Sequence, residues 1–276
     1  MTKFTKMQGL GNDYIYINGF EEKVENPSEW ARKWSDRHFG IGSDGLILIC
    51  PSDKADCRME MYNADGSRGE MCGNGIRCVA KYAYDHGLVS KEIITVETDG
   101  GIKTLWLYVE KGKVKQVKVN MGPPKLSPNE IPIKAEGHPP FTLEVQGRKV
   151  DIFPVNMGNP HGIIFWEDLE TLEIEKWGPL LEKHEVFPQR ANIEFVKVLS
   201  PREIQFRVWE RGSGETLACG TGACAVAVAC HLQGKTEKKV LVHLLGGDLD
   251  IEWAEDGNVY MTGPCEEVFQ GEIEEN

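Results

Sequence analysis

The chain carries two closely similar cysteine and glycine motifs, 147 positions apart. They are Cys72-Gly73-Asn74-Gly75 and Cys219-Gly220-Thr221-Gly222. Each motif cysteine is followed 15 residues later by a glycine, Gly87 or Gly234, as expected if a helix begins at the motif and ends at a glycine. Two similar segments at one offset predict a duplicated fold in which each half contributes one cysteine.

Hydrophobic alternation predicts that strands dominate both halves. In the first half a short helix is expected from Pro27, with Asn26 as its N-cap, and a second through Ile76–Ala83. The expected strands there are 13–17, 46–50, 58–62, 93–98, 102–110 and 113–120. Six prolines between Gly122 and Pro140 then indicate a crossing between domains.

The second half repeats this plan. Its expected helices lie around Thr171–Leu181 and over Thr221–Gln233. Its expected strands are 141–145, 150–155, 162–166, 193–198, 203–208, 240–244, 249–253 and 259–262. Because Thr221–Gln233 is apolar nearly all round, that helix must be enclosed, most simply by a curved sheet.

These patterns predict an α+β fold of two structurally similar domains related by pseudo-two-fold symmetry. Each domain is expected to be a curved mixed sheet or barrel wrapped around one central helix. We place the first domain at residues 1–120, carrying Cys72, and the second at residues 121–263, carrying Cys219. Both helix N-termini are expected to point into one cleft.

Charge and composition exclude several classes of partner. A net charge of −12, densest at the C-terminus, disfavours binding to nucleic acid. The longest uncharged run, Thr216–Gly234, holds three glycines, a histidine and a glutamine, which favours a buried helix over a membrane span. No secretory signal opens the chain, so its eight cysteines predict thiols in a reducing cytoplasm.

A cysteine just before a helix has a distinctive electrostatic setting. Unpaired N–H groups and the positive end of the helix dipole stabilise a thiolate, so the pKa of both motif cysteines is expected to fall. The same N–H groups can bind a carboxylate. If two helix ends held one substrate carboxylate, Cys72 and Cys219 would flank its α-carbon, one removing a proton and the other delivering one.

The plainer interpretation of a single copy is an ordinary buried thiol at a tight turn. Two copies at matched positions, with Asn12 and Asn159 at the same offset, favour chemistry instead. The other cysteines lack the Cys-Gly helix start and are expected to have no chemical role. They are Cys50, Cys57, Cys78, Cys224, Cys230 and Cys265.

Other polar residues are candidates for substrate binding. Arg211, after Glu210, could bind a second carboxylate with two parallel hydrogen bonds, or form a surface ion pair. Taken singly, Asn12, Asn63, Asn159 and Asn192 are most simply turn residues. His161 alone is equally compatible with an ordinary hydrogen-bonded loop residue.

At these residues the chain closely resembles the diaminopimelate epimerase family of cofactor-independent amino-acid epimerases. The matching segments run end to end: Gly11-Asn12-Asp13, Asn63-Ala64-Asp65-Gly66, Met71 to Cys78, Gly158-Asn159-Pro160-His161, Ala191-Asn192 and Glu210 to Cys224. The resemblance implies interconversion of LL- and meso-2,6-diaminoheptanedioate, on the route to lysine and peptidoglycan. It also implies the two-domain fold, with a C-terminal strand, 264–276, returning to the first domain.

The resemblance also assigns roles to residues. Cys72 and Cys219 would be the paired acid and base, and His161 would lie near the thiols. Residues implied to contact the substrate are Asn12, Asn63, Gly73, Asn74, Asn159, Asn192, Glu210, Arg211, Gly220 and Thr221. Some family members have glutamine at the position of Gly45, so that contact is not expected here. No cofactor and no metal are implied, and we expect a cytoplasmic homodimer acting on diaminopimelate alone, without nucleic acid or membrane.

Three alternatives remain open at this stage. A proline or hydroxyproline racemase uses similar paired cysteines, but typically has Cys-Gly-His-Gly where Asn74 stands here. A thiol redox or zinc protein would use Cys72, Cys78, Cys219 and Cys224, although no Cys-x-x-Cys pair occurs. A pyridoxal phosphate racemase would need a reactive lysine, and no lysine lies in a comparable glycine-rich setting.

Overall fold

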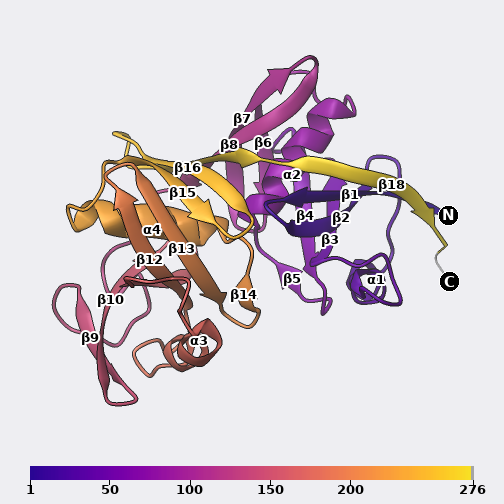
Figure 1. The fold of residues 1–276 in the computed structure, drawn as a ribbon. Coiled ribbons are helices and arrows are strands. Elements are labelled where there is room, and N and C mark those ends of the chain that lie inside the picture. Colours follow the sequence, from indigo (N-terminus) through magenta and orange to yellow (C-terminus); the bar gives the residue numbers. More distant parts are fainter. Residues whose placement is uncertain (275–276) are drawn as a thin grey trace. The chain divides into compact units, whose positions relative to one another are not determined.

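The computed structural model describes residues 1–274 and divides into two compact units (Figure 1). Unit 1 comprises Met1–Asn120 and the C-terminal segment from Thr262, and unit 2 comprises Met121–Met261. Glu275 and Asn276, at the end of the predicted returning strand, lie outside the described residues. None of the helices within residues 1–274 is long and apolar enough to cross a membrane.

Unit 1 is a curved sheet with two helices. In chain order its elements are β1 (Thr2–Gly9), β2 (Asn12–Asn18), α1 (Pro27–Ser35), β3 (Gly45–Cys50), β4 (Cys57–Asn63), β5 (Arg68–Gly69), α2 (Gly73–Asp85), β6 (Ile93–Thr98), β7 (Gly101–Glu110), β8 (Lys113–Gly122) and β18 (Glu266–Ile273). The last strand, β18, pairs antiparallel with β1, so the two ends of the chain meet in one sheet.

The elements of unit 2 are β9 (Phe141–Val145), β10 (Arg148–Asn156), β11 (Pro160–Phe165), α3 (Ile174–Glu182), β12 (Asn192–Ser200), β13 (Glu203–Glu210), β14 (Gly214–Thr216), α4 (Gly220–Leu232), β15 (Lys239–Leu244), β16 (Gly247–Trp253) and β17 (Val259–Pro264). From β10 to β17, unit 2 repeats the order of elements from β1 to β8. Strand β9 pairs antiparallel with β10, and this pair is equivalent to the antiparallel pair of β18 and β1 in unit 1.

Strand pairing shows that the duplication extends to register. In unit 1, β2 and β3 run parallel with Ile15 opposite Leu46. In unit 2, β11 and β12 run parallel with Gly162 opposite Ile193, which are the same positions moved by 147 residues. Each unit has a second parallel pair, β4 with β6 and β13 with β15. The predicted α+β fold of two similar domains is therefore confirmed.

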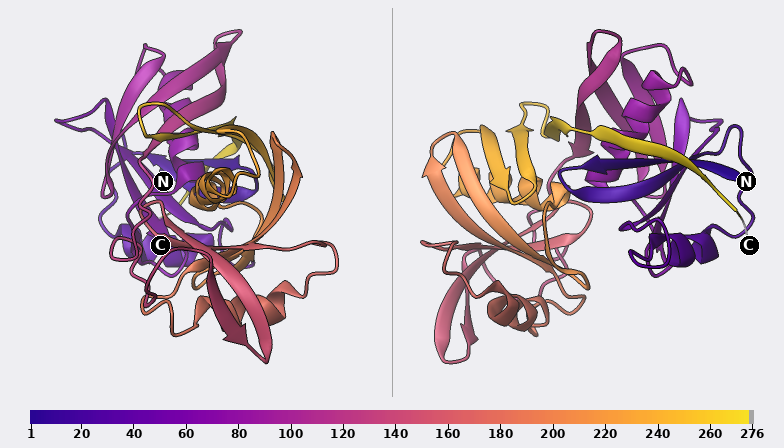
Figure 2. Two further views of the ribbon diagram at one scale, coloured as in Figure 1. Left: turned by 90° about the vertical axis from the view of Figure 1, so that its left-hand side faces the viewer. Right: turned by 45° about the vertical axis from the view of Figure 1, so that its right-hand side comes forward.

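The central helices begin at the two motifs and are enclosed by strands. Helix α2 packs against strands from both ends of unit 1, including β1, β2 and β18. Helix α4 packs against β10, β11, β12, β15 and β16, and Figure 2 (left) looks along it inside its curved sheet. Its apolar surface, Ala223 to Cys230, is buried all round, which is the reason that this helix needs no polar face.

Three local predictions differ from the structure. Strand β1, Thr2–Gly9, was not predicted, because its five polar residues at 2, 3, 5, 6 and 8 obscure the alternation. Asn26 occupies the N-cap of α1, but its side chain makes no capping hydrogen bond. Helix α3 begins at Ile174, later than Thr171, because the Thr171 hydroxyl bonds to Asp168 in the preceding turn.

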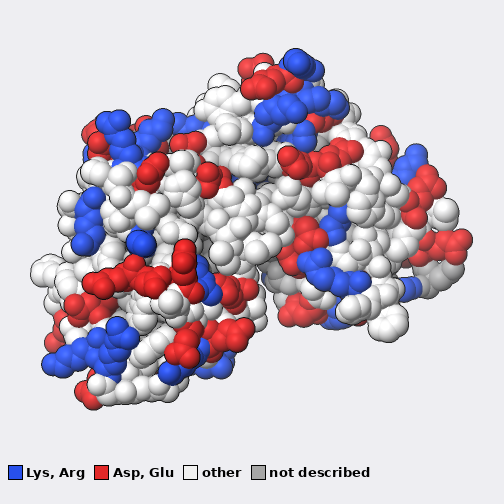
Figure 3. All heavy atoms as spheres, viewed as in Figure 1, with Lys and Arg blue, Asp and Glu red and all other residues white. Residues whose placement is uncertain are grey.

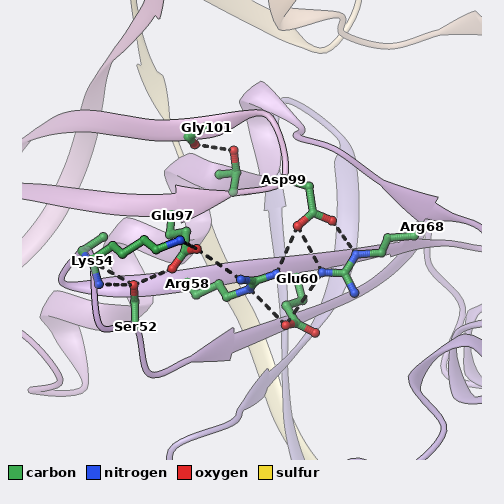
Figure 4. A network of polar contacts seen from close by, with 10 residues as sticks. Ser52, Lys54, Arg58, Glu60, Arg68, Glu97, Asp99 and Gly101 are labelled. Carbon is green, nitrogen blue, oxygen red and sulfur yellow. Dashed lines mark hydrogen bonds and ion pairs between the residues drawn. The ribbon is translucent and has the colours of Figure 1, made fainter.

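Charged side chains are mixed on the surface. On the face in Figure 3, groups of acidic and basic side chains are interspersed among uncharged residues. Across one part of unit 1, Arg58 and Arg68 share the carboxylates of Glu60 and Asp99, and Arg58 also reaches Glu97 (Figure 4). This network links β4, β5 and β6 without involving either motif cysteine.

Candidate active site

Cys72 is the N-cap residue of α2. Its backbone is extended, with φ −127° and ψ 121°, and its Sγ accepts a hydrogen bond from the Gly75 N–H at 3.3 Å. The thiol also donates to Oδ1 of Asn12 at 3.2 Å. The sulfur is therefore fixed at the helix end, and its side chain is only partly buried. That exposure leaves the thiol accessible for reaction.

Cys219 occupies the equivalent position on α4. Its φ of −120° and ψ of 109° repeat the extended cap, and its Sγ accepts from the Gly222 N–H, again at 3.3 Å. The Thr221 hydroxyl lies 3.5 Å from the sulfur. Unlike Cys72, Cys219 is buried, with 6% of its surface exposed. The two thiols thus share a backbone geometry but differ in environment.

The first turns of α2 and α4 present backbone N–H groups next to each sulfur. Gly73 and Asn74 are the first two helical residues in unit 1, and Gly220 and Thr221 are their counterparts in unit 2. N–H groups at these positions have no acceptor within the helix. Each helix start can therefore hold a carboxylate beside its thiol.

The second glycine of each motif allows the helix to approach the sheet closely. A Cβ atom on Gly222 would lie 2.8 Å from Oε1 of Glu194 and 3.2 Å from Sγ of Cys219. In unit 1, a Cβ on Gly75 would lie 2.8 Å from Cδ1 of Ile47. The second glycine of each Cys-Gly-x-Gly motif therefore lets the first turn of the helix pack directly against a side chain from β3 or β12.

The expected fall in pKa does not hold for Cys219. Burial raises the pKa of its thiol well above the usual value, and the carboxylates of Glu210 and Glu194 raise it further. Hydrogen bonds from Thr221 and the Gly222 N–H act in the opposite direction but are outweighed. Desolvation and these acidic neighbours therefore favour the thiol form of Cys219 and outweigh the effect of the helix end.

This environment predicts slow alkylation of Cys219. At pH 8 iodoacetamide is expected to modify Cys219 more slowly than Cys72, because the thiolate is the reacting form and a raised pKa leaves less of it. Peptide mapping by mass spectrometry over time measures both rates, with buried Cys57, whose pKa burial raises to about 12, as the slow reference. Faster modification of Cys219 than of Cys72 would contradict the assignment.

Of the candidate binding residues of unit 1, Asn12 contacts the residue at the helix start. Asn12, which accepts from the Cys72 thiol, donates from Nδ2 to Asp44 at 2.7 Å. Asn63 ends β4 and donates to the Ser67 hydroxyl at 2.9 Å. Opposite Asn63 stands Gly45, with φ +158°, where a Cβ would lie 2.1 Å from the Tyr62 carbonyl oxygen. A glutamine could not replace Gly45 without moving these strands.

The candidate binding residues of unit 2 form two groups. His161, on β11, lies 3.0 Å through Nε2 from Oδ1 of Asn159. Asn192 accepts the Arg211 backbone N–H at 2.8 Å, and the Arg211 guanidinium, which is exposed, donates to the Gln189 carbonyl at 3.0 Å. Among residues 1–274, no carboxylate forms an ion pair with the Arg211 guanidinium, so the alternative of a surface ion pair is not supported.

Glu210 ends β13 and is positioned by the strand that follows. The Thr216 hydroxyl on β14 donates to Oε1 of Glu210 at 2.5 Å. The Glu210 carboxylate is also among the causes of the raised Cys219 pKa, so it lies in the electrostatic range of that thiol. Glu210 therefore belongs with Cys219 rather than with the exposed Arg211 guanidinium.

Three residues at the helix starts were not predicted. Arg77, fully buried in α2, donates to the Gly73 carbonyl, to Asn74 Oδ1 and to the Pro264 carbonyl at 2.8–3.1 Å. Tyr14 is buried, and burial together with the nearby Cys72 and Asp44 raises its pKa well above the usual value. Glu194, fully buried in β12, lies 2.6 Å from Nδ1 of His161. Arg77 and Glu194 are each a single charged residue inside an otherwise apolar run, and this pattern in the sequence could have identified them.

Three of the remaining cysteines have settings typical of inert thiols. Burial raises the pKa of Cys50 to about 11 and that of Cys57 and Cys230 to about 12. Within residues 1–274, no group of three or more His, Cys, Asp or Glu side chains is arranged to hold a metal ion. Cys72 and Cys219 are thus distinguished from these thiols by their helix-cap geometry.

Sequence relatives match the chain over nearly its whole length. A family model described as diaminopimelate epimerase matches residues 4–127 and 153–268. A diaminopimelate epimerase of Agathobacter rectalis is 57% identical over 99% of both chains. One of Acetivibrio thermocellus is 56% identical, also over 99% of both chains.

Solved structures with low identity share the fold. A probable proline racemase from Agrobacterium radiobacter K84 superposes with a TM-score of 0.72 at 14% identity, covering 100% of this chain and 94% of that chain. A phenazine biosynthesis protein of the PhzF family from Bacillus anthracis gives a TM-score of 0.74 at 14% identity, covering 99% and 98%. These likenesses extend to the fold alone.

Proposed function

The chain belongs to the diaminopimelate epimerase family, and we propose that it interconverts LL- and meso-2,6-diaminoheptanedioate with Cys72 and Cys219 as its two proton carriers. The chain is an amino-acid epimerase of lysine biosynthesis that acts on diaminopimelate. The observation that carries the two-thiol proposal is the repeated cap: two cysteines, each receiving an N–H hydrogen bond at 3.3 Å at the start of a 13-residue helix.

In the proposed reaction, one sulfur is a thiolate and the other a thiol. The thiolate takes the α-proton, and the electrons of the broken C–H bond pass into the substrate carboxylate. The opposite thiol then donates its proton to the other face of the same carbon. No oxidant or reductant is consumed, and the two cysteines finish with exchanged protonation states. The raised pKa of Cys219 favours its thiol form, which is the form that donates a proton.

Most of the rate acceleration must come from stabilising charge on the carboxylate, because an α-carbon is a very weak acid. The N–H groups of Gly73, Asn74, Gly220 and Thr221 are proposed to hold that carboxylate. Each well-placed donor to a developing oxyanion contributes about 3–4 kcal/mol. Proton transfer by a positioned acid or base adds a factor of roughly 10²–10⁴ in rate.

The distal end of the substrate is proposed to be held without reaction. Diaminopimelate carries a second carboxylate and ammonium, which need complementary polar groups. We assign this role to Asn63, Asn159, Asn192 and the exposed guanidinium of Arg211, with Asn12 and Glu210 nearer the thiols. An amino acid without the second carboxylate would leave these groups unpaired, and this penalty gives specificity.

Exchange of α-protons in deuterated water tests this proposal. We expect exchange on diaminopimelate to be much faster than on proline, and Arg211→Met to reduce that preference by roughly tenfold or more through a higher KM. Arg202→Met, which removes only an exposed ion pair with Glu237, is the matched control. Faster exchange on proline than on diaminopimelate by the unaltered enzyme would overturn the substrate assignment.

We further propose a cytoplasmic homodimer. Paired catalytic thiols need a reducing compartment, because otherwise they are open to oxidation. Two-fold dimers are the commonest assembly of soluble enzymes. Light scattering of the purified protein measures the mass directly, and a single mass near the 30.9 kDa of one chain would reject the dimer.

A further inference from the structure

Glu194 is a buried carboxylate that the proposed reaction does not use. It lies in β12 opposite Val208, with no exposed surface, and its Oε1 is 2.6 Å from Nδ1 of His161. Its second oxygen, Oε2, has no hydrogen-bond partner among residues 1–274. A buried carboxylate with one unsatisfied oxygen costs stability, so its presence needs a compensating role.

Packing does not require a carboxylate at this position, as unit 1 demonstrates. The residue 147 positions earlier is Ile47, which lies opposite Met61 in the equivalent strand pair. A Cβ atom built on Gly75 would lie 2.8 Å from the Ile47 side chain. A Cβ atom built on Gly222 would lie the same distance from the Glu194 side chain, so the two side chains occupy equivalent positions. An apolar side chain therefore suffices to seat the helix, and Glu194 is a departure specific to unit 2.

Glu194 sets the state of the His161 ring. Because Nδ1 faces a carboxylate oxygen, it carries a proton and donates it. The other nitrogen, Nε2, lies 3.0 Å from the Asn159 amide. In the neutral ring Nε2 accepts from the amide N–H, whereas in the charged ring it donates to the amide oxygen. The protonation of His161 thus decides whether the oxygen or the nitrogen of the Asn159 amide faces away from the ring.

The same carboxylate also touches the start of α4. Its Oε1 occupies the space beside Gly222 in the first turn, where Cys219 is the N-cap. Glu194 is among the causes that raise the Cys219 pKa, after burial and Glu210. One buried group therefore acts on both the thiol side and the Asn159 side of unit 2.

We propose that Glu194 is a positioning residue of the epimerase: it holds His161 with Nδ1 protonated and, through His161, orients the Asn159 side chain toward the substrate. This inference rests on the proposed role of Asn159 in binding the distal end of diaminopimelate. This positioning effect of Glu194 passes through His161 and is separate from the direct electrostatic effect of Glu194 on the Cys219 thiol.

Two substitutions separate charge from hydrogen bonding. Glu194→Ile introduces the residue of unit 1 and removes both charge and acceptor, whereas Glu194→Gln keeps an oxygen that can accept from Nδ1. Asp85→Asn is the control: Asp85 is also buried, 4% exposed and paired with Lys81, but lies at the other end of α2 in unit 1. It is expected to leave kcat and KM unchanged within twofold.

The imidazole ¹⁵N spectrum of His161 gives the first readout. In the unaltered enzyme Nδ1 is expected to carry the proton, in Glu194→Gln this pattern is expected to persist, and in Glu194→Ile it is expected to be lost. Glu194→Ile should raise KM for diaminopimelate roughly tenfold to a hundredfold, the effect of losing a charge-assisted hydrogen bond. The accompanying fall in kcat should be smaller.

Coupling to Asn159 gives the second readout. Asn159→Ala is expected to raise KM by itself, and adding Glu194→Ile should then raise it no further, because the two residues act in one chain. Independent effects of the two substitutions on KM, or a His161 spectrum unchanged in Glu194→Ile, would overturn the proposal.

Binding of diaminopimelate to the Cys72→Ala, Cys219→Ala double variant keeps this test separate from the chemistry. Calorimetry on that variant measures affinity without turnover, and adding Glu194→Ile is expected to weaken binding by the same tenfold to hundredfold. Undiminished affinity would count against Glu194. Activity in the double variant would instead reject the two-thiol mechanism while leaving the Glu194 result interpretable.

Discussion

Replacing either Cys72 or Cys219 with alanine is expected to lower the epimerisation rate by roughly 10³–10⁴-fold, because each removes one of two required proton carriers. Polarimetry or a coupled assay in both directions measures the loss. Cys50→Ala is the control, since Cys50 lies in β3 away from a helix cap and is only partly buried. Its activity is expected to stay within twofold of that of the unaltered enzyme.

Serine substitutions distinguish proton transfer from helix capping. Both cysteines accept an N–H hydrogen bond at the helix start, so alanine also removes a cap, which costs about 1 kcal/mol. Serine preserves that cap but is a far weaker acid than cysteine. Cys72→Ser and Cys219→Ser should therefore retain stability and still lose activity. Full activity in any of these four variants would refute the two-base mechanism.

Arg77→Met is expected to lower the free energy of unfolding of unit 1 by about 3 kcal/mol or more, since three acceptors would each lose a buried donor. Those acceptors lie in the first turn of α2 and at Pro264, where the chain returns to unit 1. Burial lowers the pKa of Arg77 from its usual value, which shows the desolvation that these hydrogen bonds offset. Urea unfolding followed by circular dichroism measures the change.

Arg68→Met is the matched control for this stability prediction. Arg68 also bonds to carboxylates, but its side chain is 41% exposed, and exposed ion pairs contribute roughly 0–1 kcal/mol. An unfolding midpoint for Arg77→Met equal to that of Arg68→Met would contradict the proposed role of Arg77. Loss of activity in Arg77→Met without loss of stability would point instead to a direct part in the reaction.

The two helix starts carry opposite buried charges. Arg77 lies in the first turns of α2, and its counterpart in α4 is the buried Cys224. Glu194 lies under the first turn of α4, and its counterpart under α2 is Ile47. A nearby cation favours a thiolate and a nearby anion favours a thiol. The duplicated motif thus supplies two similar sulfurs, and residues outside it make their environments differ.

Much of the fold was predictable because its signals are local. The alternation of residues 93–98 and 141–145 gave strand bounds that the structure reproduces. The Cys-Gly starts and the later glycines located α2 and α4 to within two residues. The short strands β5 and β14 were missed, since two or three residues carry no periodicity.

The structure brings some of the predicted site residues into contact, whereas the electrostatics of the thiols differ from the prediction. Cys72 with Asn12, and Asn192 with Arg211, make contacts within their own units. By contrast, the pKa of Cys219 was expected to fall and instead rises. That error came from reasoning about one helix end without the burial and the two carboxylates that other strands bring to it.

The sequence by itself determined the family, the duplication and the two cysteines at helix starts, because a repeat, a cap and a glycine turn are written in neighbouring residues. Only the tertiary structure decided that Glu194 bonds to His161, that Arg77 is buried against Pro264 and that the pKa of the Cys219 thiol is raised. These outcomes depend on desolvation and on partners from distant segments. Both are set when the sheet closes around the helix, not by local pattern.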